Sequence, residues 1–225
     1  MPVPHEISRN SIGAFLSEEY LAENTAGNQR LSVAAYRLLA RGSAVSTADL
    51  AKALTKAEAH VSTLLDLLPP SVLDRDADGR ITAFIGLSLA PTAHSFTIGA
   101  QKLYTWCVLD ALFLPEILGE RASVATICPA SGQAINLELT PTRIVAERPA
   151  GVVMSVVAPD AQSCRENLRG AFCSHVNLFA GANIFDDWAK ARPGVAYIPL
   201  VEAFDLARMR NRERYPDIDL RVHVI

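Results

Sequence analysis

The feature that most constrains the fold of this chain is an apolar run from Leu103 to Leu118, in which Asp110 and Glu116 are the only charged residues. A membrane-spanning helix needs about 20 consecutive apolar residues, so this run is too short and too charged to span a bilayer. It has to be buried inside a folded domain instead. An ionised carboxylate is costly to bury without a partner. Asp110 therefore either lies half-exposed at the edge of a core helix or belongs to a site.

The composition indicates a folded protein without a membrane segment. The chain has 225 residues, of which half are hydrophobic and 20% are charged, and its formal net charge is −3. So much apolar surface excludes a disordered chain, and the length fits one large domain or two small ones. A negative net charge disfavours nucleic acids and anionic membranes as partners. The N-terminus also lacks the basic and apolar regions of a secretory signal. We therefore expect a cytoplasmic protein that binds neither nucleic acid nor membrane.

Residues 1–90 are expected to form an N-terminal winged-helix-like helical domain. Apolar residues recur with the helical period in four segments: Asn10–Glu23, Leu31–Ala40, Asp49–Leu54 and Lys56–Leu68. Ser46 or Thr47 can cap the third segment, and Pro69 ends the fourth. The polar turn at residues 75–80 has apolar runs on both sides, which is typical of the wing hairpin that follows a helix-turn-helix.

The charges of this domain argue against binding to DNA. Residues 1–90 contain 8 Lys and Arg but 10 Asp and Glu. The segment in the place of a recognition helix, Ala57–Leu68, carries Glu58 and Asp66 and no Lys or Arg. Contacts to phosphates need cations. We therefore expect the domain to serve as packing or as a lid.

Residues 91–225 are expected to form a second, α/β domain with a mostly antiparallel sheet, which makes the whole chain α+β. The run Tyr104–Leu114 predicts a helix, and four segments rich in Val, Ile and Leu predict an antiparallel meander: Ser123–Ile127, Ile135–Leu139, Arg143–Ala146 and Gly151–Val157. Further helices are predicted at Ala161–Ala171, Asp186–Lys190 and Ala203–Glu213, and short strands at Val176–Phe179 and Val195–Leu200. The arginines of the last helix are expected on a solvated face.

Four cysteines carry the candidate chemistry: Cys107, Cys128, Cys164 and Cys173. They form no Cys-x-x-Cys pair, so a structural zinc site has little support, and in a cytoplasmic protein they should be free thiols. Cys107 and Asp110 are three residues apart and would share one face of a helix, where burial should raise the pKa of the carboxyl group. Cys173, followed by His175, lies at a predicted helix-to-strand junction. Two thiols and a carboxylate would make a site for a soft metal; the alternative is two buried structural cysteines and an ordinary aspartate.

The motifs around these residues resemble those of one family. They are Pro91-Thr92-Ala93-His94, the stretch from Leu103-Tyr104-Thr105-Trp106-Cys107 through Leu109-Asp110-Ala111-Leu112-Phe113-Leu114-Pro115, and Phe172-Cys173-Ser174-His175-Val176. With Asp187-Trp188-Ala189 and Val201-Glu202-Ala203-Phe204, they resemble the organomercurial lyase (alkylmercury lyase, MerB) family over about residues 10 to 210.

The resemblance implies an enzyme that cleaves the carbon–mercury bond of organomercurials, releasing a hydrocarbon and Hg(II) without an organic cofactor. It places the two mercury-binding cysteines at Cys107 and Cys173 and the proton-relaying aspartate at Asp110. It implies that small thiols or mercuric reductase take up the product. Cys128 matches a family cysteine that we interpret as structural, whereas Cys164 has no counterpart and should be a surface or packing thiol. Two alternatives remain: a winged-helix mercury sensor that binds DNA, and a mercury chaperone that binds metal without cleaving it.

Overall fold

The computed structural model describes residues 24–157 and 161–221, so the helix predicted at Asn10–Glu23 lies outside the described residues. The helices are α2 (Ala26–Leu39), α3 (Thr47–Leu54), α4 (Glu58–Asp66), α5 (Val108–Leu118), α6 (Ala161–Ala171), α7 (Ala182–Ala189) and α8 (Leu200–Arg214), with 3-10 turns η1 (Pro70–Val72) and η2 (Cys173–His175). The strands are β1 (Leu73–Arg75), β2 (Ile81–Phe84), β3 (Leu87–Ser88), β4 (His94–Ile98), β5 (Gln101–Thr105), β6 (Ala122–Ile127), β7 (Ala134–Leu139), β8 (Ile144–Arg148), β9 (Val153–Val157), β10 (Leu178–Phe179) and β11 (Val195–Pro199).

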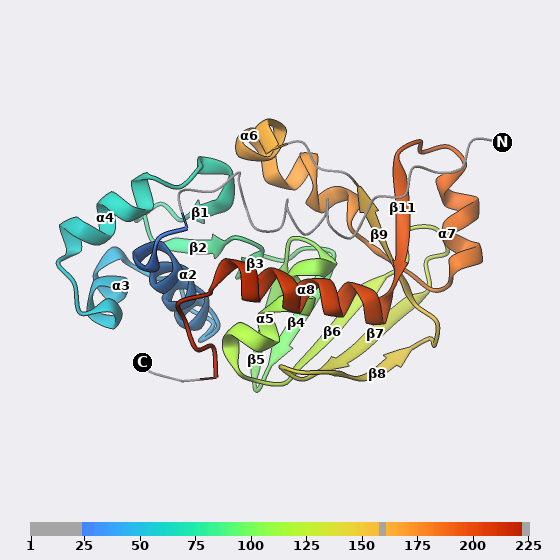
Figure 1. Ribbon diagram of the computed structural model, residues 1–225, viewed down its shortest axis with the longest axis horizontal. Coiled ribbons are helices and arrows are strands. Elements are labelled where there is room, and N and C mark those ends of the chain that lie inside the picture. Colours follow the sequence, from blue (N-terminus) through green and yellow to red (C-terminus); the bar gives the residue numbers. More distant parts are fainter. Residues whose placement is uncertain (1–23, 158–160, 222–225) are drawn as a thin grey trace.

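One eight-stranded sheet joins the two halves of the chain. Its order is β1-β2-β3-β5-β4-β6-β7-β8, and each pair of neighbours is antiparallel. The link between the halves is the pairing of β3 with β5, in which Leu87 lies opposite Thr105. Helices α2, α3 and α4 gather at one end of the molecule, beside β1 and β2 (Figure 1). The mixed α+β class and the mostly antiparallel sheet are confirmed.

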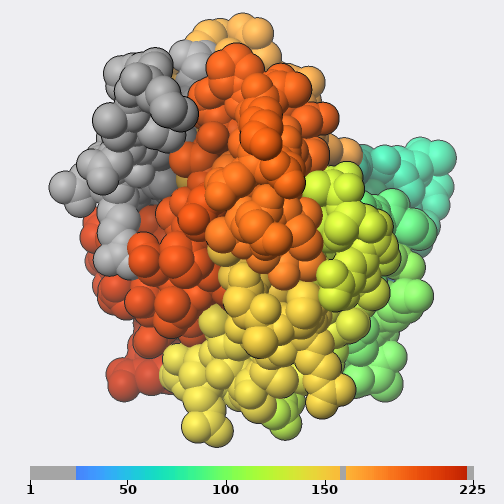
Figure 2. Space-filling model, turned by 90° about the vertical axis from the view of Figure 1, so that its right-hand side faces the viewer, coloured from blue at the N-terminus to red at the C-terminus, as the bar shows by residue number. Residues whose placement is uncertain are grey.

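A second, three-stranded sheet has the order β10-β9-β11 and corrects the predicted four-strand meander. Strands β6, β7 and β8 are neighbours as predicted, but Val153–Val157 leaves the large sheet and becomes the centre of the small one. The reason is visible in its burial: the first four residues of β9 are all buried, whereas β6 and β7 largely alternate. A strand buried on both faces needs cover on both sides. In Figure 2, the orange residues, which include α7 and β11, lie beside the yellow residues, which include β8.

The predicted helix at Tyr104–Leu114 starts later, at Val108, because the preceding residues form the β4–β5 hairpin. The residues of β4 alternate between buried and partly buried, which is the two-residue period of a strand. Gly99, at a φ of +52°, lies in the turn of this hairpin. The apolar run therefore begins as a strand and ends as a helix, and Cys107 falls between the two. Within the described residues, no helix is long and apolar enough to cross a membrane.

The arginines predicted on a solvated face of the last helix are partly buried instead. Arg210 and Arg214 on α8 are only 2% and 1% exposed. The guanidinium of Arg210 stacks on the ring of Phe113 in α5 at 3.9 Å, and Arg208 Nε lies 3.5 Å from Glu116 Oε1. A planar guanidinium can lie on an aromatic face while its charge is paired at the edge. Helix α8 consequently covers α5, as Figure 1 shows.

Candidate active site

The fold brings together Cys107, Asp110 and Cys173. One ligand atom from each, the two Sγ atoms and a carboxylate oxygen, all lie within 4.8 Å of one another, and all three residues are buried. Cys107 and Asp110 come from the start of α5, and Cys173 begins η2, far along the chain. Atoms this close can bind one metal atom, and the two sulfurs would select a soft metal over a hard one.

Cys107 and Asp110 are joined by a reciprocal cap at the N-terminus of α5. The backbone N–H of Cys107 donates to Oδ2 of Asp110 at 2.8 Å, and the backbone N–H of Asp110 donates to Sγ of Cys107. This is the capping-box arrangement, with a thiol in the place usually taken by a hydroxyl. The spacing predicted that the two side chains would share one helix face, and the structure differs from this prediction. Cys107 precedes the helix, and the cap brings its sulfur next to the carboxyl group.

Burial gives this site groups that exchange protons near neutral pH. Burial raises the pKa of Asp110 to about 6, against the opposing effects of the Cys107 hydrogen bonds and the charges of Arg210 and Arg169. Burial also raises the pKa of the Cys107 thiol, and the neighbouring Cys173 and Asp110 raise it further. At neutral pH the cluster therefore contains a carboxylate beside a protonated thiol. That carboxylate can accept the thiol proton when a metal binds the sulfur.

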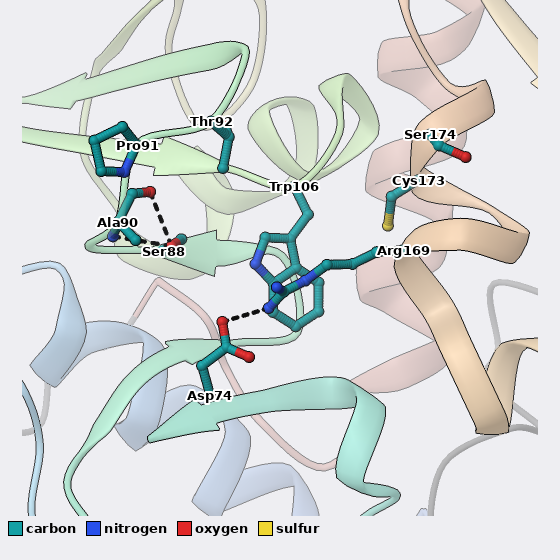
Figure 3. A pocket seen from close by; sticks show the side chains of 9 residues that line it. All are labelled: Asp74, Ser88, Ala90, Pro91, Thr92, Trp106, Arg169, Cys173 and Ser174. Carbon is teal, nitrogen blue, oxygen red and sulfur yellow. Dashed lines mark hydrogen bonds and ion pairs between the residues drawn. The ribbon is translucent and has the colours of Figure 1, made fainter. Parts of the chain in front are cut away.

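A cavity of about 230 Å³ gives access to Cys173. It is lined by Asp74, Ser88, Ala90, Pro91, Thr92, Trp106, Arg169, Cys173 and Ser174. The guanidinium of Arg169 lies 3.9 Å from the ring centre of Trp106 and bonds Asp74 at 2.5 Å, while the sulfur of Cys173 points toward the same space (Figure 3). His175 is exposed, and its backbone N–H closes the η2 turn on Phe172 O.

Comparison with known proteins decides the family. A family model described as MerB, alkylmercury lyase, matches residues 87–210. Proteins named alkylmercury lyase from Bacillus cereus and Pseudomonas putida are each 35% identical to this chain, over 77% and 80% of it and 77% and 82% of their own lengths. The chain belongs to the alkylmercury lyase family. A protein named alkylmercury lyase from Streptomyces lividans is 36% identical to this chain, over 76% of this chain and 77% of its own length.

The fold of this family member is also similar to a solved structure. The structure titled the mercury-bound form of MerB2 matches with a TM-score of 0.73, over 92% of this chain and 98% of that one. Its sequence identity is 18%, so this likeness concerns the fold alone. Most of this chain therefore follows an architecture that a solved structure already shows.

Two site residues of this family member were missed from the sequence. Gly86 packs on the Asp110 carboxyl group so closely that a Cβ there would lie 2.3 Å from Asp110 Cγ. Arg169 was treated only as part of a helix, yet it stacks on Trp106 at the cavity. The available signal for Gly86 was its place between two short apolar runs, which is typical of a hairpin turn. Arg169 gave no local signal, because its partners lie elsewhere in the chain.

The other two cysteines lie outside the three-residue cluster found among the described residues. Cys164 on α6 is fully buried, so of the two predicted alternatives it is a packing thiol. Cys128 is buried at the start of a turn closed by Gly132 N–H on its carbonyl oxygen. Burial acts to raise its pKa, but hydrogen bonds from Ser131 and from the backbone of Ala180 and Ala130 outweigh burial and lower that pKa.

Proposed function

We propose that Cys107, Asp110 and Cys173 carry out the activity of the alkylmercury lyase family in this chain, which is cleavage of the carbon–mercury bond of organomercurials to a hydrocarbon and Hg(II). The observation that carries the proposal is the cluster itself: two thiols and a carboxyl group, all buried, within 4.8 Å of one another. A family member with this donor set is an enzyme for organomercurial substrates.

The chemistry begins with exchange of a thiol proton for mercury. One cysteine sulfur takes the organomercurial cation R–Hg⁺, and its thiol proton leaves with the ligand that mercury carried before. The second sulfur then binds the same mercury while Asp110 accepts the proton of this second thiol. The second thiolate adds electron density to mercury, which weakens the bond to carbon. Soft sulfur donors hold mercury far better than oxygen donors do. The pKa of about 6 makes Asp110 suitable for receiving and returning this proton.

The second step breaks the carbon–mercury bond. The electron pair of that bond stays on carbon, which takes the proton from Asp110 and leaves as the hydrocarbon. Mercury remains as Hg(II) between Cys107 and Cys173. Because a proton replaces mercury on carbon and mercury keeps its oxidation state, the reaction needs neither an organic cofactor nor a redox partner. We further propose that small thiols, or mercuric reductase, remove Hg(II) from the two sulfurs by thiol exchange.

The N-terminal part is proposed to be a winged-helix-like domain, residues 1–90, that covers the site of the catalytic domain, residues 91–225. Helices α2, α3 and α4 followed by the β1–β2 hairpin support the winged-helix-like character of this part, whose strands β1, β2 and β3 join the sheet of the catalytic part. In the cavity Asp74 from β1 meets Arg169 from α6, so this region contributes to the wall of the site. The acidic α4 segment supports a structural role over DNA binding.

The decisive experiment is incubation with methylmercury and excess thiol, with methane measured by gas chromatography. We expect methane from the wild type and from Cys164→Ala, a matched loss of a buried thiol outside the cluster. Cys173→Ala should release almost none, and full methane release by that variant would refute the two-thiol mechanism. A chaperone would take up mercury stoichiometrically without methane. A sensor would form a tight, salt-sensitive DNA complex in a gel shift.

A further inference from the structure

We propose, building on the proposed function, that the Ile85–Gly86 turn and the Tyr36 hydroxyl are positioning elements for proton transfer: the turn packs against the Asp110 carboxyl group and excludes water from it, and Tyr36 holds the turn in place. Neither the turn nor Tyr36 belongs to the donor set of the cluster. Both come from the part of the chain that precedes the catalytic residues in sequence.

The turn has an unusual backbone that fixes its shape. Ile85 and Gly86 are the two residues between β2 and β3, and Phe84 pairs with Leu87 across them. Both have positive φ, +35° for Ile85 and +99° for Gly86. Positive φ at both central residues is the type I′ pattern of two-residue hairpins, and it is unfavourable for a β-branched residue. The fold accepts this conformation at Ile85, which is 3% exposed.

Gly86 is the residue that touches the carboxyl group. A Cβ at Gly86 would lie 2.3 Å from Cγ and 2.4 Å from Oδ1 of Asp110, and 2.8 Å from its Cβ. No side chain fits in that space without moving Asp110. The backbone of the turn therefore occupies the position where water would otherwise solvate Oδ1. The other oxygen, Oδ2, accepts the Cys107 N–H at 2.8 Å. The carboxyl group is held between the turn and the cap.

Hydrogen bonds fix the turn from both sides. The Tyr36 hydroxyl on α2 donates to Ile85 O at 2.8 Å, and this bond is buried. On the other side, the backbone N–H of Trp106, the residue before Cys107, donates to Gly86 O at 2.8 Å. The Tyr36 ring packs edge-on against Phe84, with centroids 5.3 Å apart, and Phe113, 6.1 Å away. Phe113 lies on α5 one helical turn after Asp110. Tyr36 therefore contacts both the Ile85–Gly86 turn and the helix that carries Asp110.

The first test is Tyr36→Phe, which keeps the ring contacts and removes the hydroxyl. Rapid-mixing experiments would follow mercury binding by thiol consumption and bond cleavage by hydrocarbon release. General acid–base groups contribute roughly 100- to 10,000-fold to rates; because Asp110 is retained but loosely held, we expect kcat to fall on the order of tenfold. KM and the rate of mercury binding should match the wild type, because Tyr36 is not among the residues that line the cavity. Tyr197→Phe, at a partly exposed tyrosine, is the matched control.

The second test is Gly86→Ala, compared with Gly79→Ala. Gly79 also has positive φ, +77°, but a Cβ there would meet no described atom within 4 Å, so this control reproduces the backbone strain without the contact. Displacing a reacting group by about 1 Å can cost about 100-fold in rate, so we expect kcat of Gly86→Ala to fall about 100-fold. Gly79→Ala should keep wild-type kcat.

Three outcomes separate the explanations. A selective loss of kcat in Tyr36→Phe, with mercury binding intact, supports the positioning role even when Gly86→Ala does not fold. Wild-type kcat in Tyr36→Phe, with only a lower melting temperature, would overturn it and leave Tyr36 a structural residue. If the wild-type protein itself releases no hydrocarbon, the proposed function fails instead.

Discussion

The buried carboxyl group of Asp110 should lower the stability of the folded protein as the pH rises, and Asp110→Asn should remove that effect. The variant keeps the size of the side chain and an oxygen that can accept the Cys107 N–H. In the wild type, burial raises the pKa from 3.8 to about 6. The folded state therefore holds the proton more tightly than the unfolded state.

The difference between the Asp110 pKa in the folded and unfolded states sets the sign and size of the change in the free energy of unfolding with pH. The stabilisation by the bound proton is complete below about pH 4 and is lost as the pH rises through about 6. At about 1.4 kcal/mol per pKa unit, a shift from 3.8 to about 6 corresponds to roughly 3 kcal/mol. The asparagine does not ionise. The variant should therefore gain about 3 kcal/mol relative to the wild type between about pH 4 and pH 7, and the gain should then level off.

Urea unfolding in the presence of a reductant, followed by circular dichroism at a series of pH values, measures this difference. The matched control is Asp205→Asn, at an exposed carboxylate on α8, whose stability profile should stay close to that of the wild type. Groups that do not interact with Asp110 titrate alike in the variant and the wild type, so their contributions cancel. Cys107, whose pKa Asp110 raises, stays protonated between pH 4 and pH 7 and does not disturb the comparison. A stability difference that stays constant from pH 4 to pH 7 would refute the argument that the carboxyl group is desolvated.

Other predictions concern activity. Asp110→Asn should still bind methylmercury but release methane roughly 100-fold more slowly or worse, because an amide cannot relay a proton; wild-type turnover would remove Asp110 from the mechanism. Cys107→Ser should lose most of its methane release in the same assay, since a hydroxyl is a hard, weak ligand for mercury. In wild type, kcat/KM should decline as the pH falls through about 6, because a protonated Asp110 cannot accept the thiol proton. Arg169→Gln removes a charge that lowers the Asp110 pKa, so this acid limb should move to higher pH, as a pH–rate profile would show.

Much of the local structure could be predicted from the sequence. Helices α6 and α8 and strands β6 and β7 lie within a few residues of their predicted bounds, because hydrophobic period and breaking residues act over neighbouring positions. Helix α2 was predicted at Leu31–Ala40 but begins earlier, at Ala26. The β4–β5 hairpin was not predicted, because the apolar run that contains β5 continues directly into α5 and has no breaking residue at the border. Its strand character depends on pairing with β3 and β6, which are distant in sequence.

The sequence by itself determined the donor chemistry of this protein: two cysteines and an aspartate within family motifs, on a chain with too little positive charge to favour DNA. Only the tertiary structure decided that Cys173 meets Cys107 and Asp110, that Arg210 is buried on Phe113, and that Gly86 lies against the carboxyl group. Residue types and short spacings can be taken directly from the sequence. Contacts between distant segments, and the burial that raises the pKa of Asp110, exist only once the whole chain has packed.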